Sequence, residues 1–374
     1  MNTQKVREIQ VLLSQKFRTR TQRFERFIPL LSFIAGFLWD SATLTRIDRL
    51  KDNLLLLAYW LGLSLTLVLS QLARAQALKH PKLIEYQRYY PWLMNFFQGG
   101  LFSAYVVYYF QSASLSKNFL FVVLLALLLV ANEFLKTRLE ALGLQLALYF
   151  LLTQSFAAFF FPIISRTISH PVFVVAGVFS FVALVVILAV LYRSQVITKD
   201  RDLLKLFGIG VCCFGVIETA YQSNLIPPVP LSLKNAGVYH TVNKQGARYQ
   251  LGYEPAKWHQ FWRTSDPIFH FQPGKDQVVG FFSIFAPPGI KMNIDELWMW
   301  KNPATQTWQQ RDAHQFTIEG GREEGWRSYF IKKKMVEGQW RVRLQDKESR
   351  LLGVFEFEVE FVSTPVKPLE IVVR

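Results

Sequence analysis

Hydrophobic and polar residues alternate strictly near the C-terminus, and this pattern predicts the clearest element of the chain. In Gln339–Asp346 (QWRVRLQD) and Leu352–Phe361 (LGVFEFEVEF), every second residue is apolar. Successive side chains of a strand leave on opposite faces, so both segments are predicted strands with one core face and one charged face. Pairing them about Lys347–Glu348 as a hairpin places Trp340 opposite Phe355.

The N-terminal half has a different pattern, long runs of apolar residues without alternation. About 20 mainly apolar residues are needed to cross a bilayer as a helix, so the runs predict about seven transmembrane helices. The seventh contains three glycines and is the least regular. The runs are Phe27–Trp39, Leu54–Leu72, Trp92–Phe110, Phe119–Leu135, Leu142–Phe161, Val172–Tyr192 and Leu203–Tyr221.

After the last run, short segments separated by turn residues predict a β-domain. About seven short strands in roughly 90 residues are typical of an all-β immunoglobulin-like sandwich, and a small barrel is the alternative. The fold class predicted is thus a membrane all-α N-terminal half plus a C-terminal all-β immunoglobulin-like sandwich. The predicted divisions are a basic cytoplasmic lead-in (1–26), a multi-span helical domain (27–221), an extended connector with short strands (222–275) and the β-sandwich (276–374).

Composition and charge support this division. Of the 374 residues, 51% are hydrophobic and 18% are charged, and the net charge is +15. The segments on one side of the predicted spans (1–26, 73–91, 136–141, 193–202) carry 16 Lys and Arg, against 5 in 40–53, 111–118 and 162–171. Basic loops remain cytoplasmic, so we expect an inner-membrane protein with a cytoplasmic N-terminus and, after seven spans, an extracytoplasmic β-domain. The basic residues border apolar runs, which argues for a lipid bilayer as partner and against nucleic acid.

Three strand-like strings carry a family resemblance. Gly325–Tyr329, Gly338–Val342 and Gly353–Val359 resemble the C-terminal module of the domain of unknown function 2914 family. Near the N-terminus, Gly36–Asp40 and Thr43–Asp48 resemble a signature of its multi-span members. The resemblance implies an architecture, namely spans followed by a β-module, and no activity.

Aromatic and basic residues of the β-domain are the candidate binding site. A tryptophan face stacks on sugars or peptides, while the alternative is that the same rings form the core. The candidates are Trp298, Trp300, Trp308, Arg341 and Arg343.

Polar residues near the ends of the apolar runs are candidates for a role within the membrane. A buried carboxylate there suggests a proton relay, and the alternative is a paired or solvated helix-end residue. We expect Asp40 to pair with Arg46 in the first predicted loop. The candidates are Asp40, Arg46, Asp48, Glu133 and Glu218.

No catalytic motif, metal-ligand spacing or cofactor-binding pattern occurs in the sequence, and the two cysteines, Cys212 and Cys213, lie within an apolar run. We therefore expect no catalytic residues, no metal and no cofactor. The leading hypothesis is a non-enzymatic membrane protein that displays its β-domain to an envelope partner, a protein or a glycan. The alternative is a transporter-like or membrane-embedded enzyme with the β-domain as a lid.

Overall fold

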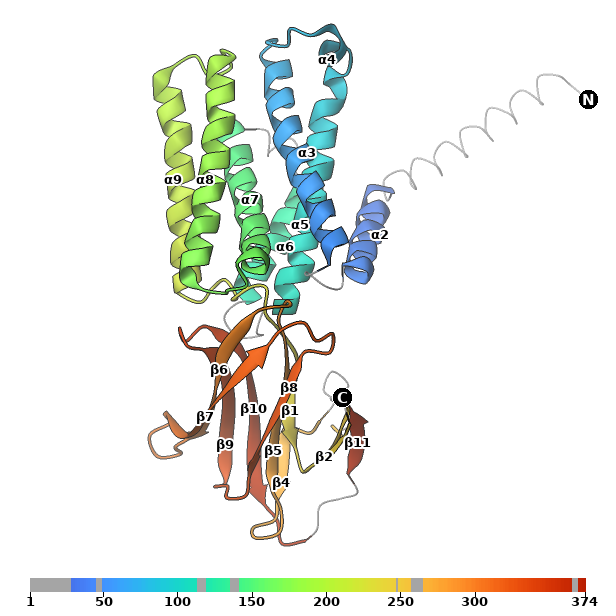
Figure 1. The fold of residues 1–374 in the computed structure, drawn as a ribbon, viewed down its shortest axis with the longest axis vertical. Helices are drawn as coiled ribbons and strands as arrows, with labels where there is room; N and C mark the ends of the chain where they lie inside the picture. The colour runs from blue at the N-terminus through green and yellow to red at the C-terminus, as the bar shows by residue number, and fades with distance from the viewer. Residues whose placement is uncertain are drawn as a thin grey trace, which may run out of the picture. The chain divides into compact units, whose positions relative to one another are not determined.

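The computed structural model describes residues 28–44, 49–112, 119–134, 141–246, 248–256, 265–364 and 369–374 (Figure 1). The chain divides into two compact units, Met1–Thr45 and Arg46–Arg374. The first unit contains helix α2 (Ile28–Thr43). The second contains the other helices and all the strands. The basic lead-in predicted at 1–26 lies outside the described residues.

Six helices of the second unit follow the predicted apolar runs, and two short ones, α4 and η1, lie in the basic segment 73–91 between them. They are α3 (Leu50–Arg74), α4 (Pro81–Glu85), the 3-10 turn η1 (Gln87–Tyr89), α5 (Tyr90–Ser112), α6 (Phe119–Phe134), α7 (Leu142–Ser165), α8 (His170–Arg193) and α9 (Asp200–Gln222). Among the described residues, four helices are long and apolar enough to cross a membrane, namely α3, α7, α8 and α9, and α6 is a shorter apolar helix. The helical half is therefore that of a membrane protein with four candidate spans.

Helix α8 shows how these helices suit lipid. Its valines at 175, 178, 182 and 186 form one stripe and are 51–57% exposed, whereas Ala176, Gly177, Ser180 and Leu184 are fully buried. Small and polar residues inside and branched apolar residues outside are typical of helices that pack in a bilayer. The helices are also joined by polar contacts. Examples are the hydrogen bonds from Trp60 to Thr153, from Gln71 to Gln145 and from Ser180 to Gln154, of 3.0, 2.7 and 3.1 Å.

The strands form three sheets. Their bounds are β1 (Ser232–Tyr239), β2 (Thr241–Gln245), β3 (Arg248–Tyr253), β4 (Ile268–Phe271), β5 (Val278–Phe285), β6 (Lys291–Lys301), β7 (Trp308–Glu319), β8 (Trp326–Lys332), β9 (Gly338–Asp346), β10 (Leu351–Phe361) and β11 (Glu370–Val373). The sheet orders are β1-β5-β8, β4-β10-β9-β6-β7 and β11-β3-β2. The segment predicted as a connector is therefore part of the β-domain, because β1 pairs with β5 and β4 pairs with β10.

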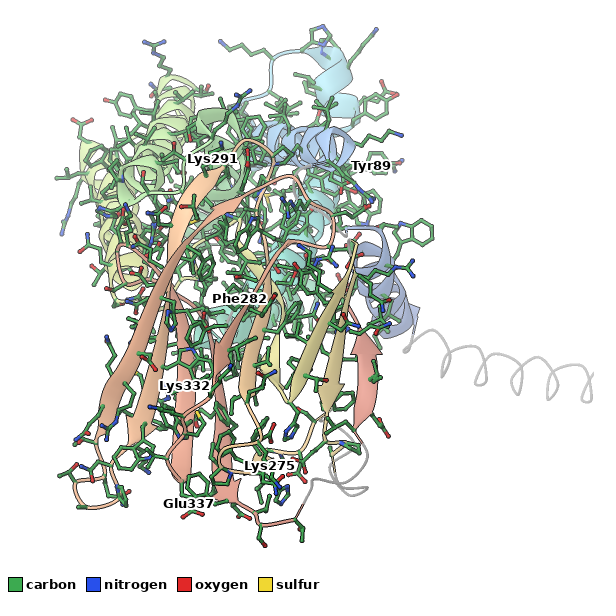
Figure 2. All side chains as sticks on the ribbon, turned by 60° about the horizontal axis from the view of Figure 1, so that its bottom comes forward. Tyr89, Lys275, Phe282, Lys291, Lys332 and Glu337 are labelled. Carbon is green, nitrogen blue, oxygen red and sulfur yellow. The ribbon has the colours of Figure 1, made fainter. Side chains whose placement is uncertain are left out.

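Strand β5 explains the layering of the sheets, because every residue in it is buried. Phe282 and Ile284 pack with residues of the five-stranded sheet, and Phe282 lies inside the domain in Figure 2. Val279 and Phe281, which have the opposite parity, pack with Tyr249 and other residues of the β11-β3-β2 sheet. The β1-β5-β8 sheet is thus the middle layer of three, and its central strand is apolar on both faces.

The final hairpin forms as predicted, with a different register. Trp340 lies opposite Phe357, and Phe355 lies opposite Val342. The prediction of a Trp340–Phe355 pair is therefore wrong by two residues. The ladder has an irregularity between Leu351 and Gly353 that the alternation did not reveal. A shift of two residues preserves the face of every side chain.

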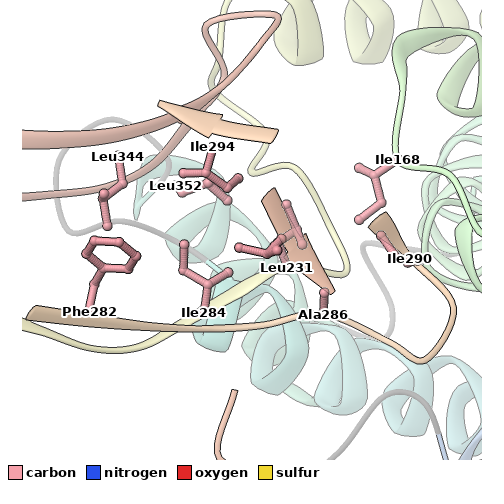
Figure 3. Packing of buried hydrophobic residues seen from close by; sticks show 10 residues of the cluster. Ile168, Leu231, Phe282, Ile284, Ala286, Ile290, Ile294, Leu344 and Leu352 are labelled. Atoms are coloured by element: carbon pink, nitrogen blue, oxygen red, sulfur yellow. The ribbon is translucent and has the colours of Figure 1, made fainter. Parts of the chain in front are cut away.

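The β-domain contacts the helices at the ends of α5 and α9 and at the connection between α7 and α8. Ile168, between α7 and α8, packs into the domain core beside Leu231 and Ile290 (Figure 3). The buried guanidinium of Arg350 pairs with Asp346 at 2.5 Å, donates to the Tyr221 hydroxyl, and donates to the Ile168 carbonyl at 3.2 Å. The C-terminal ends of α7 and α9 and the start of α8 therefore meet the β-domain on one side. Ser232 adds the end of α5 through a 2.6 Å hydrogen bond to the Gln111 carbonyl.

Candidate functional site

The outward side chains of the five-stranded sheet form a mixed aromatic, basic and apolar surface, which we call the outer face. Its aromatic, basic and apolar side chains are all partly exposed, and they are those of Leu297, Met299, Trp308, Arg341, Arg343 and Val354. Register places them in adjacent rows, because Met299 lies opposite Arg341, and Arg343 lies opposite both Leu297 and Val354. The exposed carboxylates of Glu356 and Glu358 lie on the same face. On β6 and β9 the neighbours along the strand, Trp298, Val342 and Leu344, point inward and are buried, as alternation requires.

Trp308 and Arg341 are in direct contact on the outer face. The Arg341 guanidinium carbon lies 4.1 Å from the centroid of the Trp308 ring, within the range of a cation–π interaction. The same guanidinium is held from the other side by Glu356, with Nη2–Oε1 and Nε–Oε1 distances of 2.6 and 2.7 Å. The ring and the cation are therefore held in a fixed arrangement at the surface, which reduces the entropy that a ligand would lose on binding.

Arg343 is the second basic group of the outer face. Its Nε is buried and has no hydrogen-bond partner among the described residues. Leu297 and Val354 flank it on the two neighbouring strands. A buried donor without an acceptor is costly, so an acceptor from a bound partner would stabilise this arrangement.

Trp298 and Trp300 lie on the other side of the sheet. Trp298 is 0% exposed, packs against Trp340 and Phe357, and donates its indole hydrogen to Glu296 at 2.9 Å. Trp298 is therefore a core residue, which is one of the two alternatives that the sequence left open, and it is not available for stacking on a ligand at the surface. Trp300 packs at the edge of the same core. Its indole donates to the Glu337 carbonyl at 3.0 Å, and Arg311 lies 4.6 Å above its ring.

The polar residues predicted near the membrane do not form one site among the described residues. Glu218, near the end of α9, pairs with His170 at the start of α8 at 3.1 Å, which is a pairing between helix ends. Glu133 lies in the last turn of α6, and Asp40 lies in α2. Arg46 and Asp48 lie outside the described residues, and the expected pairing of Asp40 with Arg46 lies outside them too.

A cluster of histidines and carboxylates, which sequence reasoning missed, joins the three sheets. His240 is 4% exposed, and its two ring nitrogens lie 2.8 Å from Asp276 and 2.9 Å from Glu254. Glu254 also accepts from the backbone N–H of His270 at 3.1 Å and contacts the His270 ring nitrogen Nδ1 at 2.6 Å. We call these four residues the His240 cluster. His240 directly follows β1, Glu254 follows β3, His270 lies in β4, and Asp276 precedes β5. Their spacing in the sequence contains no signal that they converge.

The electrostatics of the His240 cluster favour a charged imidazole. Burial lowers the pKa of His240, but hydrogen bonds and charge from Asp276 and Glu254 outweigh burial, and the net pKa is raised. For Glu254, burial raises the pKa, and the hydrogen bonds from His240 and His270 outweigh it, so the net pKa is lowered. The cluster is therefore an ion-paired clamp between sheets. It lies next to Lys275, at the end of the β-domain away from Lys291 (Figure 2).

Glu296 is a carboxyl group inside the core. It is 2% exposed, and burial raises its pKa to about 7, against the opposing hydrogen bond from Trp298. Gly280 of β5 faces this pair. A Cβ atom at Gly280 would lie 2.6 Å from the Trp298 ring and 3.2 Å from the Glu296 oxygen, so only glycine fits here. Within the described residues, no group of three or more His, Cys, Asp or Glu side chains is placed to hold a metal ion.

Comparisons with known proteins support the predicted resemblance. Residues 297–359, which run from β6 to β10 and contain the outer face, match a family model described as "Protein of unknown function (DUF2914)". The matched residues lie in the β-domain and include the three strings that carry the resemblance.

No curated protein matches the chain. Among solved structures, the chain is similar to the Pseudomonas fluorescens alkylpurine DNA glycosylase AlkC bound to DNA containing an abasic site analog. The identity is 9%, the likeness covers 76% of this chain and 83% of that chain, and the TM-score is 0.23. A likeness at this score carries no argument about fold or function.

Proposed function

We propose that the chain is a non-enzymatic multi-pass protein of the inner membrane. It has seven spans and a cytoplasmic N-terminus, and it displays an immunoglobulin-like sandwich, extended by a third sheet, outside the membrane. The outer face of the five-stranded sheet binds an envelope partner, a protein or a glycan.

The position of the β-domain relative to the basic helix ends supports the extracytoplasmic assignment. The domain contacts the ends of the helices at Gln111, Ile168 and Tyr221. A helix of 23 to 25 residues is about 35 Å long, so the opposite ends lie across a bilayer thickness. Most of the basic residues that the structure describes between residues 49 and 222 lie at those opposite ends, namely Arg74, Lys79, Lys82, Arg88, Arg193, Lys199, Arg201 and Lys205. Basic ends of this kind remain cytoplasmic, which supports our proposal of an extracytoplasmic β-domain.

The observation that carries the binding function is the fixed Trp308–Arg341 pair beside Arg343 on a partly exposed sheet face. A flat aromatic ring stacks on a sugar or a peptide, and the guanidinium groups donate to its hydroxyl, carbonyl or carboxylate oxygens. The matched family segment contains the same strands. These features suit recognition without any bond being made or broken.

Photo-crosslinking in native membranes tests this function. A diazirine amino acid replaces Met299, in the centre of the outer face, or Lys334, which is exposed outside it. We expect a discrete adduct from position 299, its loss when Arg343→Gln is added, and no such adduct from position 334. Equal adducts from both positions, or none from position 299, would contradict a binding role of the outer face.

A further inference from the structure

A basic cleft lies apart from the outer face, between the β2–β3 hairpin and the segment before β8. It consists of two hollows of about 420 and 550 Å³ that share Glu324 and Arg327 in their walls. Each volume is in the range of small-ligand sites. The cleft collects residues from four separate parts of the chain, so its charge is produced by the fold and not by one basic run.

Five basic side chains line the two hollows against two carboxylates, which leaves the cleft positively charged. The basic residues are Lys244, Arg248, Arg322, Arg327 and Arg374, and the carboxylates are Glu323 and Glu324. Like charges gathered in a concave surface focus the field and attract anions. Arginine guanidinium groups match the paired oxygens of a phosphate group better than lysine does, because two N–H groups donate in parallel.

Tyr249 lines the hollow of about 420 Å³. Its ring is buried, and Lys244 Nζ and Arg327 Cζ lie 5.6 and 5.7 Å from the ring centroid. The ring therefore positions one cation from β2 and one from β8 in the same hollow, and this lowers the entropic cost of binding between them. Gly246, at the hairpin turn with φ of +60°, has open space where a side chain would stand, and this keeps the mouth clear.

We propose that this cleft binds a ligand with two linked phosphate groups, one in each hollow, with Arg327 between them. The shared wall at Arg327 sets the spacing of the two groups, and Arg248 and Lys244 each contact one of them. This site is independent of the outer face, so either proposal can fail without the other.

The test is calorimetric titration of the detergent-purified full chain with pyrophosphate. We expect saturable binding that weakens with salt, and a loss of about tenfold or more in affinity for Arg327→Gln and for Arg248→Gln. Arg327→Lys keeps the positive charge but loses the paired N–H donors of the guanidinium, so its pyrophosphate affinity should lie between that of the native chain and that of Arg327→Gln. Arg341→Gln removes a cation of the outer face and should leave pyrophosphate affinity unchanged.

A repeat in nanodiscs distinguishes the source of the phosphate. Weaker pyrophosphate binding in discs of phosphatidylglycerol than in discs of phosphatidylcholine would identify lipid headgroups as competing occupants. Equal binding in both would identify a soluble ligand. If pyrophosphate does not bind to the native chain, the proposal is wrong. It is also wrong if Arg341→Gln lowers pyrophosphate affinity as much as Arg327→Gln does, because binding would then depend on the net charge of the protein and not on the cleft.

Discussion

Trp340 and Phe357 lie opposite each other in the β9–β10 ladder, and both side chains are almost completely buried against Trp298. The Trp298 ring meets the Phe357 ring edge to face, with centroids 6.2 Å apart. Glu358, the next residue, points to the outer face and is exposed. The hairpin therefore places a core residue and a solvent residue side by side in the sequence.

This contrast gives the first prediction. In a fragment beginning at Ser232, which contains no cysteine, we expect one cooperative unfolding transition in denaturant. Phe357→Ala should lower the free energy of unfolding by about 3–5 kcal/mol, because it empties a buried aromatic site. Glu358→Ala should lower it by less than about 1 kcal/mol. Equal losses for the two variants would contradict the assigned faces.

The same hairpin shows which features were predictable. Alternation in β9 and β10 predicted the strands and the face of each side chain, because parity survives a shift of two residues. It did not predict the register, because the irregularity after Leu351 depends on the turn. The sequence left open whether Trp298 lies at the surface or in the core. Its ring packs in the core against Gly280 of β5, a strand of another sheet, and local alternation contains no information about that contact.

Of the candidate site, alternation in β9 predicted that Arg341 and Arg343 share the face opposite Trp340 and Val342. Trp308 was chosen for its ring alone, and its position beside Arg341 follows from the pairing of β7, β6 and β9, which local alternation does not record. The His240 cluster could not be predicted. His240, Glu254, His270 and Asp276 come from four segments whose convergence depends on three sheets packing together, and no local pattern records such a contact.

The second prediction concerns pH and His240. Its pKa in the folded protein is raised, so the folded state retains the proton more strongly than the unfolded chain. The contribution is complete below the unfolded pKa of about 6.5 and is lost as pH rises through the folded pKa. We expect the free energy of unfolding of the fragment to fall as pH rises above about 6.5, and His240→Gln to make this fall smaller. An unchanged slope in the variant would refute the clamp.

The third prediction concerns Glu296. Its folded pKa of about 7 lies above the unfolded pKa of about 4.3, so the fold loses stability as pH rises between these two values and the loss is complete above pH 7. Glu296→Gln keeps an acceptor for the Trp298 indole and removes this cost. At pH 8 the variant should be more stable than the native fragment by up to about 3 kcal/mol, and the difference should disappear near pH 4.5. If the variant is instead less stable than the native fragment at pH 8, the prediction is wrong, because the ionised Glu296 carboxylate would then be stabilised by a partner group in the folded protein.

The fourth prediction concerns the junction between the helices and the β-domain. Arg350→Gln leaves the buried Asp346 carboxylate without its cation, which costs about 3–5 kcal/mol. Arg341→Gln, which removes a partly exposed pair with Glu356, should cost less than about 1 kcal/mol. Thermal unfolding of the full chain in detergent, followed by tryptophan fluorescence, compares the two. Equal midpoints would mean that the Arg350 contacts do not hold the junction.

The most direct test of the account is the side of the membrane on which the β-domain lies. In a chain carrying Cys212→Ser and Cys213→Ser, single cysteines replace Lys301 in the β-domain or Lys82 at the basic end of the helices. Cells with a permeabilised outer barrier and an intact inner membrane are treated with an impermeant maleimide. The account predicts labelling at position 301 in intact cells and labelling at position 82 only after lysis. Labelling at position 301 only after lysis would place the β-domain in the cytoplasm and contradict the proposed function.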